Sequence, residues 1–94
     1  MRAREPRRSS FARGYTKRWT ATATAFRLRY PLCGMRAGGQ APVMSQCALE
    51  GRETPATQTD HVVPHRGDRA VFWNVWNLQS LCDACHSRKT QAGL

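Results

Sequence analysis

The chain has 94 residues, enough for one small domain, and a domain of this size rarely buries enough apolar surface to be stable without disulfides or a bound metal. It contains no stretch of roughly 20 apolar residues that would span a membrane. Its arginine-rich start lacks the apolar run of a signal peptide, so we expect a cytoplasmic protein with no membrane partner. Residues 1–29 carry nearly all of the net charge of +9. Such a clustered positive segment fits a polyanion such as nucleic acid, or simply a solvated leader.

Residues 1–13 form a basic arm with dense arginines, one proline and little apolar content, and we expect them to be disordered in the unbound chain. The pattern then changes, and a single domain is predicted over residues 14–92. Its first element is an amphipathic helix, because apolar residues recur at helical spacings until Pro31 ends the helix. The residues of this apolar face are Trp19, Ala23, Phe26 and Tyr30.

The middle of the chain is predicted to be irregular, and its last third to hold two short strands and two helices. Residues 34–46 contain three glycines and one proline without periodicity, which is typical of a flexible loop. Residues 57–63 are strand-like, and Asp68 is placed to cap a short helix behind them. Residues 77–81 alternate polar and apolar side chains as a half-buried strand does, and a helix is expected over residues 83–91. The expected fold class is therefore α+β.

The four cysteines are candidate metal ligands. Cys82 and Cys85 form a C-x-x-C at the start of the last predicted helix, a spacing that lets both thiolates bind one tetrahedral Zn²⁺. Thioredoxin-like redox pairs share this spacing, but they need a βαβ context that the pattern lacks. We interpret the glycine-rich loop between Cys33 and Cys47 as an insertion inside a zinc knuckle, since lengthening a loop costs only about 0.6 kcal/mol per doubling. The alternative is a degenerate site in which one of this pair is only a small buried apolar residue.

The sharpest chemical signal is the pair Asp60 and His61 together with Asn77 and His86. Hydrolysis of a phosphodiester needs a metal that neutralises developing charge and a base that activates water. Asp60 is a hard oxygen ligand, and an imidazole with a pKa of about 6.5 suits a general base. Neighbouring side chains of a strand point to opposite faces, so Asp60 and His61 are predicted to do different jobs. Because successive helix residues are about 100° apart, Cys85 can face a zinc ion while His86 turns toward the strands.

The residues DHVVP at 60–64 and NLQSLCDACHSRKT at 77–90 resemble the HNH endonuclease family, particularly its small phage type. The core of the motif spans residues 57–91. One departure is Arg36, which stands where the second cysteine of the first pair is expected. The resemblance implies a small ββα-metal (His-Me finger) domain with a structural zinc site and an N-terminal helix.

The resemblance also implies a role for each residue of the site. Asp60 and His86 would hold a divalent cation (Mg²⁺, Mn²⁺, Ni²⁺ or Zn²⁺), and His61 would deprotonate the attacking water. Asn77 would hydrogen-bond to the backbone and so position His61. The implied activity is metal-dependent cleavage of DNA, as a nick or a double-strand break, in a bacterial or phage-infected cell. Proteins of phage DNA packaging are expected partners by analogy alone. The structural zinc ligands would be Cys33, Cys47, Cys82 and Cys85.

Several basic side chains are expected to contact DNA. Lys89 shares a helix face with His86 and is placed to meet a substrate phosphate. The other candidates are Arg66, Arg88, Lys17 and Arg18. Three aromatic residues fit either the core or stacking on bases, and we favour the core; they are Phe72, Trp73 and Trp76. The alternative function is a non-catalytic zinc-containing module that binds nucleic acid, which leaves the Asp-His-Asn-His set unexplained.

Overall fold

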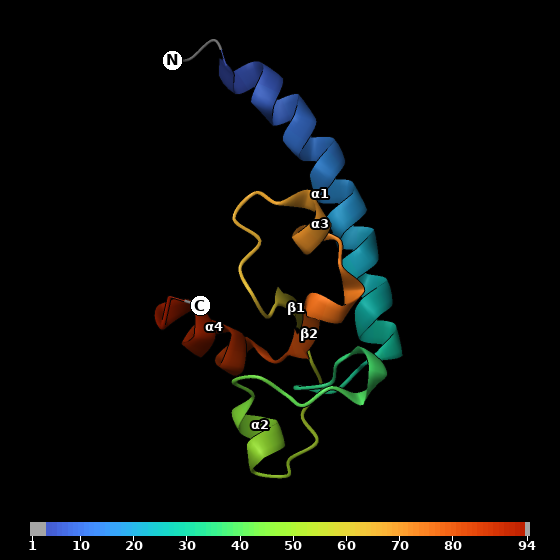
Figure 1. Cartoon of the computed structure of the whole chain (residues 1–94), viewed down its shortest axis with the longest axis vertical. Coiled ribbons are helices and arrows are strands. Elements are labelled where there is room, and N and C mark those ends of the chain that lie inside the picture. Colours follow the sequence, from blue (N-terminus) through green and yellow to red (C-terminus); the bar gives the residue numbers. More distant parts are fainter. Residues whose placement is uncertain (1–3, 94) are drawn as a thin grey trace.

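The computed structural model describes the backbone of residues 4–93 and the side chains of residues 16–93. Helix α1 (Arg4–Arg29) runs along one side, and strands β1 (Gln58–His61) and β2 (Leu78–Leu81) lie beside its second half, followed by helix α4 (Asp83–Gln91) (Figure 1). The expected α+β class is confirmed. Within residues 4–93, no helix has both the length and the apolar character needed to cross a membrane. The shorter elements are η1 (Ala37–Gly39), α2 (Gln46–Leu49), α3 (Arg69–Phe72) and η2 (Val75–Asn77).

Helix α1 begins at Arg4, so residues 4–13 of the basic arm are helical in the structure, whereas disorder was expected there. Arg and Ala have high helix propensity, and Pro6 lies in the first turn, where a proline does not interrupt the helix. The first turns of α1 project beyond the rest of the molecule (Figure 1). Residues 1–3 of the expected arm lie outside the described residues.

The second half of α1 packs against β1, as its apolar spacing predicts. Ala23 and Phe26 are buried. The hydroxyl of Thr59 in β1 donates a hydrogen bond to the carbonyl of Ala23 (2.9 Å) and accepts one from the guanidinium of Arg27 (3.0 Å). Both an apolar and a polar contact therefore fix the helix to the strand that carries the Asp-His pair.

The two strands pair antiparallel, with Asp60 opposite Gln79 and His61 opposite Leu78. All four residues of β2 are buried, so the expected half-buried strand is wrong in one respect. The polar side chains of β2 do not face solvent. The end of α1 and the glycine-rich loop cover them, and Ser80 donates a hydrogen bond to the carbonyl of Tyr30 (2.5 Å).

The glycine-rich loop is fixed to β2 by hydrogen bonds, although the sequence predicted a flexible segment. Gln79 is fully buried; its Oε1 accepts from the Val43 N–H (2.6 Å) and its Nε2 donates to the Val43 carbonyl (2.7 Å). The Gly34 N–H donates to the Ser80 carbonyl (2.6 Å), and the Ser80 N–H donates to the Met35 carbonyl (3.1 Å). The loop therefore has a defined backbone path.

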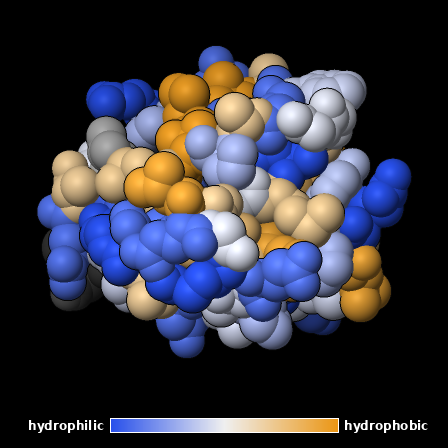
Figure 2. Space-filling view, turned by 90° about the horizontal axis from the view of Figure 1, so that it is seen from below, coloured by the Kyte–Doolittle hydropathy of each residue, from blue (hydrophilic) through white to orange (hydrophobic). Residues whose placement is uncertain are grey.

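Seen from the end that carries α2, the surface shows apolar patches separated by hydrophilic residues (Figure 2). Phe72 is buried, as expected of a core residue, but Trp76 is 55% exposed, so its expected place in the core is wrong. The Trp76 ring lies against Gly38, which has a left-handed φ of +68°. A larger residue at this glycine would be strained and would collide with the ring.

Gln79→Leu should lower the free energy of unfolding by about 1–3 kcal/mol, because both polar backbone groups of Val43 would lose their partner. Urea unfolding followed by tryptophan fluorescence measures this loss. The matched control is Gln91→Leu, at an exposed position at the end of α4, which should change stability by no more than about 0.5 kcal/mol. Equal effects of the two substitutions would contradict the role given to Gln79.

Candidate active site

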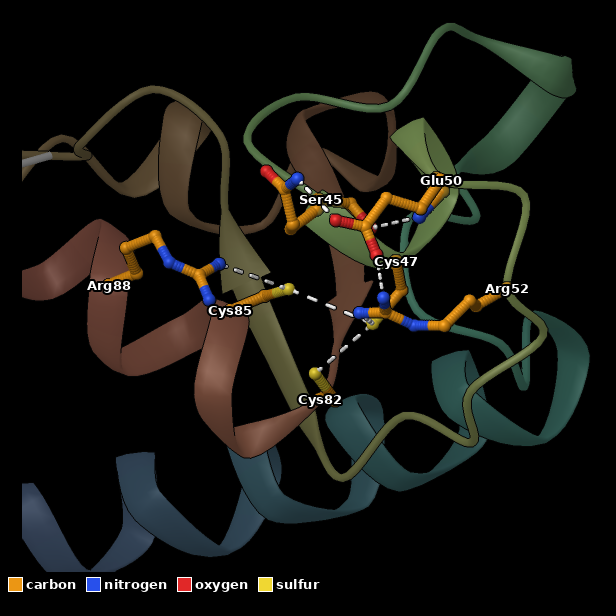
Figure 3. A network of polar contacts seen from close by, with 9 residues as sticks. Ser45, Cys47, Glu50, Arg52, Cys82, Cys85 and Arg88 are labelled. Carbon is orange, nitrogen blue, oxygen red and sulfur yellow. Dashed lines mark hydrogen bonds and ion pairs between the residues drawn. The ribbon is translucent and has the colours of Figure 1, made fainter.

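The four cysteines come together from three separate segments. Cys33 follows α1, Cys47 lies in α2, Cys82 caps α4 and Cys85 lies in its first turn. Their Sγ atoms lie within 4.8 Å of one another. The sulfur of Cys47 lies 3.7 Å from that of Cys82 and 4.0 Å from that of Cys85, and Figure 3 shows these three cysteines. Bonds of about 2.3 Å to one tetrahedral Zn²⁺ would place the sulfur atoms about 3.8 Å apart. The cluster therefore fits one metal ion, including the half-site stretched by the long loop.

The surroundings of two of the sulfur atoms favour the thiolate, which is the metal-binding form. The guanidinium of Arg52 lies 3.6 Å from Cys47 Sγ, and that of Arg88 lies 3.7 Å from Cys85 Sγ (Figure 3). Hydrogen bonds from Thr54 and Arg52 lower the pKa of Cys47. Burial by itself would raise the pKa of Cys85, but hydrogen bonds from backbone groups of α2 and from other thiols lower it to about 6.

His86, the residue after Cys85, lies near Asp60 of β1. Its Nε2 atom is 3.7 Å from Asp60 Oδ1, which is too far for a hydrogen bond. Two metal–ligand bonds of about 2.1 Å allow one ion to lie between atoms up to about 4.2 Å apart, so the pair fits a shared divalent cation. The Asp60 side chain is 13% exposed and the His86 side chain 36% exposed, so the place between them is open to solvent on the histidine side.

His61 contacts a different part of the chain from Asp60, as strand alternation predicts. Its Nε2 lies 2.9 Å from the carbonyl oxygen of Phe72. Because a carbonyl only accepts hydrogen bonds, Nε2 carries the proton and Nδ1 keeps the lone pair. The imidazole stacks on Trp19 of α1, with ring centroids 4.8 Å apart and an interplanar angle of 21°. Burial lowers the pKa of His61 below 6.5, so its imidazole is neutral at pH 7.

Asn77 closes the loop that connects β1 and β2. Its side-chain Nδ2 donates to the Val63 carbonyl (2.9 Å), and its Oδ1 accepts from the Val63 N–H (2.9 Å). Its backbone carbonyl accepts from the Val62 N–H (2.7 Å). These bonds fix the chain directly after His61, which is the kind of contact that the family resemblance implied for this asparagine.

Lys89 is buried, whereas it was expected at the surface in contact with a substrate phosphate. Its side chain is 2% exposed, and its Nζ is 3.0 Å from Asp60 Oδ2 and 3.1 Å from the His61 carbonyl oxygen. Helical phase correctly placed it on the face of His86, but that face packs on β1. The ammonium is therefore not available for the expected contact with a substrate phosphate.

The other basic residues expected at DNA lie on three different segments. Lys17 and Arg18 belong to the exposed side of α1, where the Arg18 guanidinium lies 4.5 Å from the centroid of the Trp73 ring. Arg66 is exposed in the loop after β1, in a left-handed conformation (φ 48°). Arg88 is exposed on α4 and contacts the cysteine cluster described above.

Sequence reasoning did not assign two contacts that shape this site. Trp19 was expected only in the apolar face of a helix, yet its ring covers the imidazole of His61. The Phe72 carbonyl, which fixes the His61 tautomer, is a backbone group and leaves no mark in the sequence. Both contacts join segments that are distant along the chain, so no local pattern indicates them.

Two comparisons with known proteins give a match. The family model described as HNH endonuclease matches residues 45–92. The crystal structure of an HNH endonuclease from the deep-sea thermophilic bacteriophage GVE2, with manganese ion, matches at 29% identity and a TM-score of 0.64, covering 99% of this chain and 92% of that chain. No curated protein matches. The chain therefore belongs to the HNH endonuclease family and is a metal-dependent endonuclease.

Proposed function

We propose that the chain hydrolyses DNA phosphodiester bonds, with His61 as the general base and a divalent cation held by Asp60 and His86. The observation that carries this proposal is the 2.9 Å contact between Nε2 of His61 and the Phe72 carbonyl oxygen, which determines the tautomer. Its Nε2–H is bound to the Phe72 carbonyl, so a neutral imidazole keeps a free lone pair on Nδ1, one residue from the Asp60–His86 pair. Phosphodiester hydrolysis requires a base and a cation, and consecutive residues of β1 supply the base and one ligand of the cation.

Each residue has a defined part in this mechanism. His61 Nδ1 takes a proton from the water that attacks phosphorus, and the hydrogen bond from Nε2 to the Phe72 carbonyl then stabilises the imidazolium. The Trp19 ring holds the plane of the imidazole, and Asn77 holds the backbone that follows it. The bound cation supplies positive charge to the phosphate and to the leaving oxygen.

The remaining parts of the chain have supporting roles in this proposal. Residues 14–92 form the nuclease domain around the core motif of residues 57–91, and Zn²⁺ occupies the cysteine cluster, whose sulfur spacing suits it. Similarity to a phage enzyme supports action in the cytoplasm of a bacterial or phage-infected cell. Phage packaging proteins as partners stay a prediction. The surface residues proposed to contact the DNA backbone are Lys17, Arg18, Arg66 and Arg88.

His61→Ala should reduce the rate of plasmid cleavage by about 10²–10⁴-fold, because the attacking water loses its base. Cleavage is measured with Mg²⁺, Mn²⁺, Ni²⁺ or Zn²⁺ added to the full chain. His65→Ala is the matched control, since the Nδ1 of His65 already accepts a hydrogen bond from the Gly67 N–H (3.0 Å), and it should cost less than about tenfold.

Unchanged cleavage by His61→Ala would refute the mechanism. DNA binding in a gel-shift assay, without cleavage under any of these cations, would instead favour the non-catalytic module. Zinc content and thermal unfolding of each variant show whether it is folded.

The pH dependence of cleavage should follow the lowered pKa of His61. The base acts only when neutral, so the rate should rise with pH and reach half its maximum below about pH 6.5, the ordinary value for histidine. Single-turnover rates at saturating Mn²⁺ measure this, because the cation site is then occupied throughout the pH series. A midpoint above about pH 6.5 would contradict the buried environment described for His61.

Cys47→Ser should abolish tight zinc binding and lower the thermal stability, because one of the four sulfur ligands is lost. Metal analysis of the purified chain measures the zinc bound per molecule. Ser45→Ala is a control in the same segment: it removes the hydroxyl 3.1 Å from Cys33 Sγ but leaves all four thiols in place, and it should retain the zinc. Unchanged zinc in Cys47→Ser would remove Cys47 from the site.

A further inference from the structure

Lys89 is a charged side chain in a place where charges are rarely found. It is among the most buried side chains of the described residues, with 1% of the whole residue exposed. Removing an ammonium from water is costly unless acceptors compensate it. Among its contacts are two on consecutive residues of β1, the carboxylate of Asp60 (3.0 Å) and the carbonyl of His61 (3.1 Å).

The two carboxylate oxygens of Asp60 therefore have different surroundings. Oδ1 is the oxygen that faces His86, at 3.7 Å. Oδ2 is buried and accepts no well-aligned hydrogen bond, so the charge of Lys89 at 3.0 Å is what compensates it. The ammonium therefore lies against one of the two carboxylate oxygens and leaves the other facing His86.

We propose that Lys89 is a positioning residue that restricts Asp60 to one ligand oxygen, Oδ1, and that lowers the affinity of the site for its cation. This inference rests on the proposed function, in which Asp60 and His86 hold the divalent cation. A positive charge on Oδ2 withdraws part of the carboxylate's charge and repels a second cation beside it. The cation thereby keeps more of its own charge for the substrate phosphate.

A simple brace between α4 and β1 would have different consequences. If Lys89 only tied the helix to the strand, its loss would disorder Asp60 and His86 and would weaken cation binding, as the loss of groups that orient metal ligands usually does. If the charge of Lys89 restrains Asp60, the loss of Lys89 leaves the negative charge of Asp60 without a compensating ammonium. A bound cation can then compensate this charge, so cation binding becomes stronger. The direction of the change in affinity separates the two roles.

The test uses the full chain with its cysteine site loaded, dialysed free of other divalent ions. Lys89→Met preserves the length of the stem without the charge, and Mn²⁺ binding is measured by electron paramagnetic resonance and by the rise in melting temperature on adding Mn²⁺. The dissociation constant should fall by about threefold or more, and the melting temperature should rise further than in the wild type. Cleavage at saturating Mn²⁺ should slow by about tenfold or more.

Lys17→Met is the matched control for Mn²⁺ binding, because it removes the charge of an exposed lysine of α1 and should leave the affinity unchanged. Lys89→Gln provides a second variant if Lys89→Met does not fold, since the amide still donates to the His61 carbonyl without a charge. Unchanged or weaker Mn²⁺ binding, or an unchanged cleavage rate, overturns the proposal. His86→Ala tests the cation site independently of Lys89. If this variant binds Mn²⁺ as the wild type does, the proposed cation site is wrong. If it loses Mn²⁺ binding, the cation site stands, and the Lys89 variants alone decide the role of Lys89.

Discussion

The cluster of four sulfur atoms is the constraint on which the rest of this structure depends. The sheet has two strands of four residues each, and such a pair is marginally stable by itself. The cluster joins the segment after α1, helix α2 and the start of α4, and it buries Leu81 among the cysteines. The first turn of α4 is thereby fixed, and His86 follows Cys85 directly, so the direction of its side chain toward β1 depends on the cluster. In the proposed mechanism, a metal bound by these thiolates would therefore influence catalysis through the orientation of α4.

Two side-chain amides, one just before β2 and one within it, fix the loops by hydrogen bonds. Asn77 binds both polar backbone groups of Val63, and Gln79 binds both polar backbone groups of Val43. Each amide replaces the partner that a neighbouring strand would provide, because it offers one donor and one acceptor to the backbone. Both loops are thus held through their backbone, and in the glycine-rich loop the side chains of Arg36 and Gln40 also donate to the Trp76 carbonyl. A long glycine-rich insertion between Cys33 and its partner ligand is therefore compatible with a fixed site.

The sequence predicted the features that depend on local chemistry. Asp68 caps α3 by accepting from two backbone N–H groups, and strand alternation correctly separated the contacts of Asp60 from those of His61. The sequence did not predict which faces of an element pack against other elements and which meet solvent. Helical phase placed Lys89 on the face of His86, but phase does not say whether that face meets solvent or β1. Trp76 was expected in the core because so small a domain needs its large apolar residues there, whereas in the structure it covers a glycine at the surface.

Helix α1 also completes the surroundings of His61, the proposed base, although the helix lies outside residues 45–92, where the family model matches. Trp19 stacks on His61, and the centroid of its ring is 5.0 Å from that of Phe72, whose carbonyl holds the imidazole. Arg18, the residue before Trp19, contacts the ring of Trp73. A basic side chain of α1 therefore lies next in the sequence to the tryptophan that stacks on His61. DNA held along α1 would therefore lie against the same turn of helix that fixes the base. In the proposed function, Arg18 and His61 would therefore act in one site, joined by the Trp19–His61 contact.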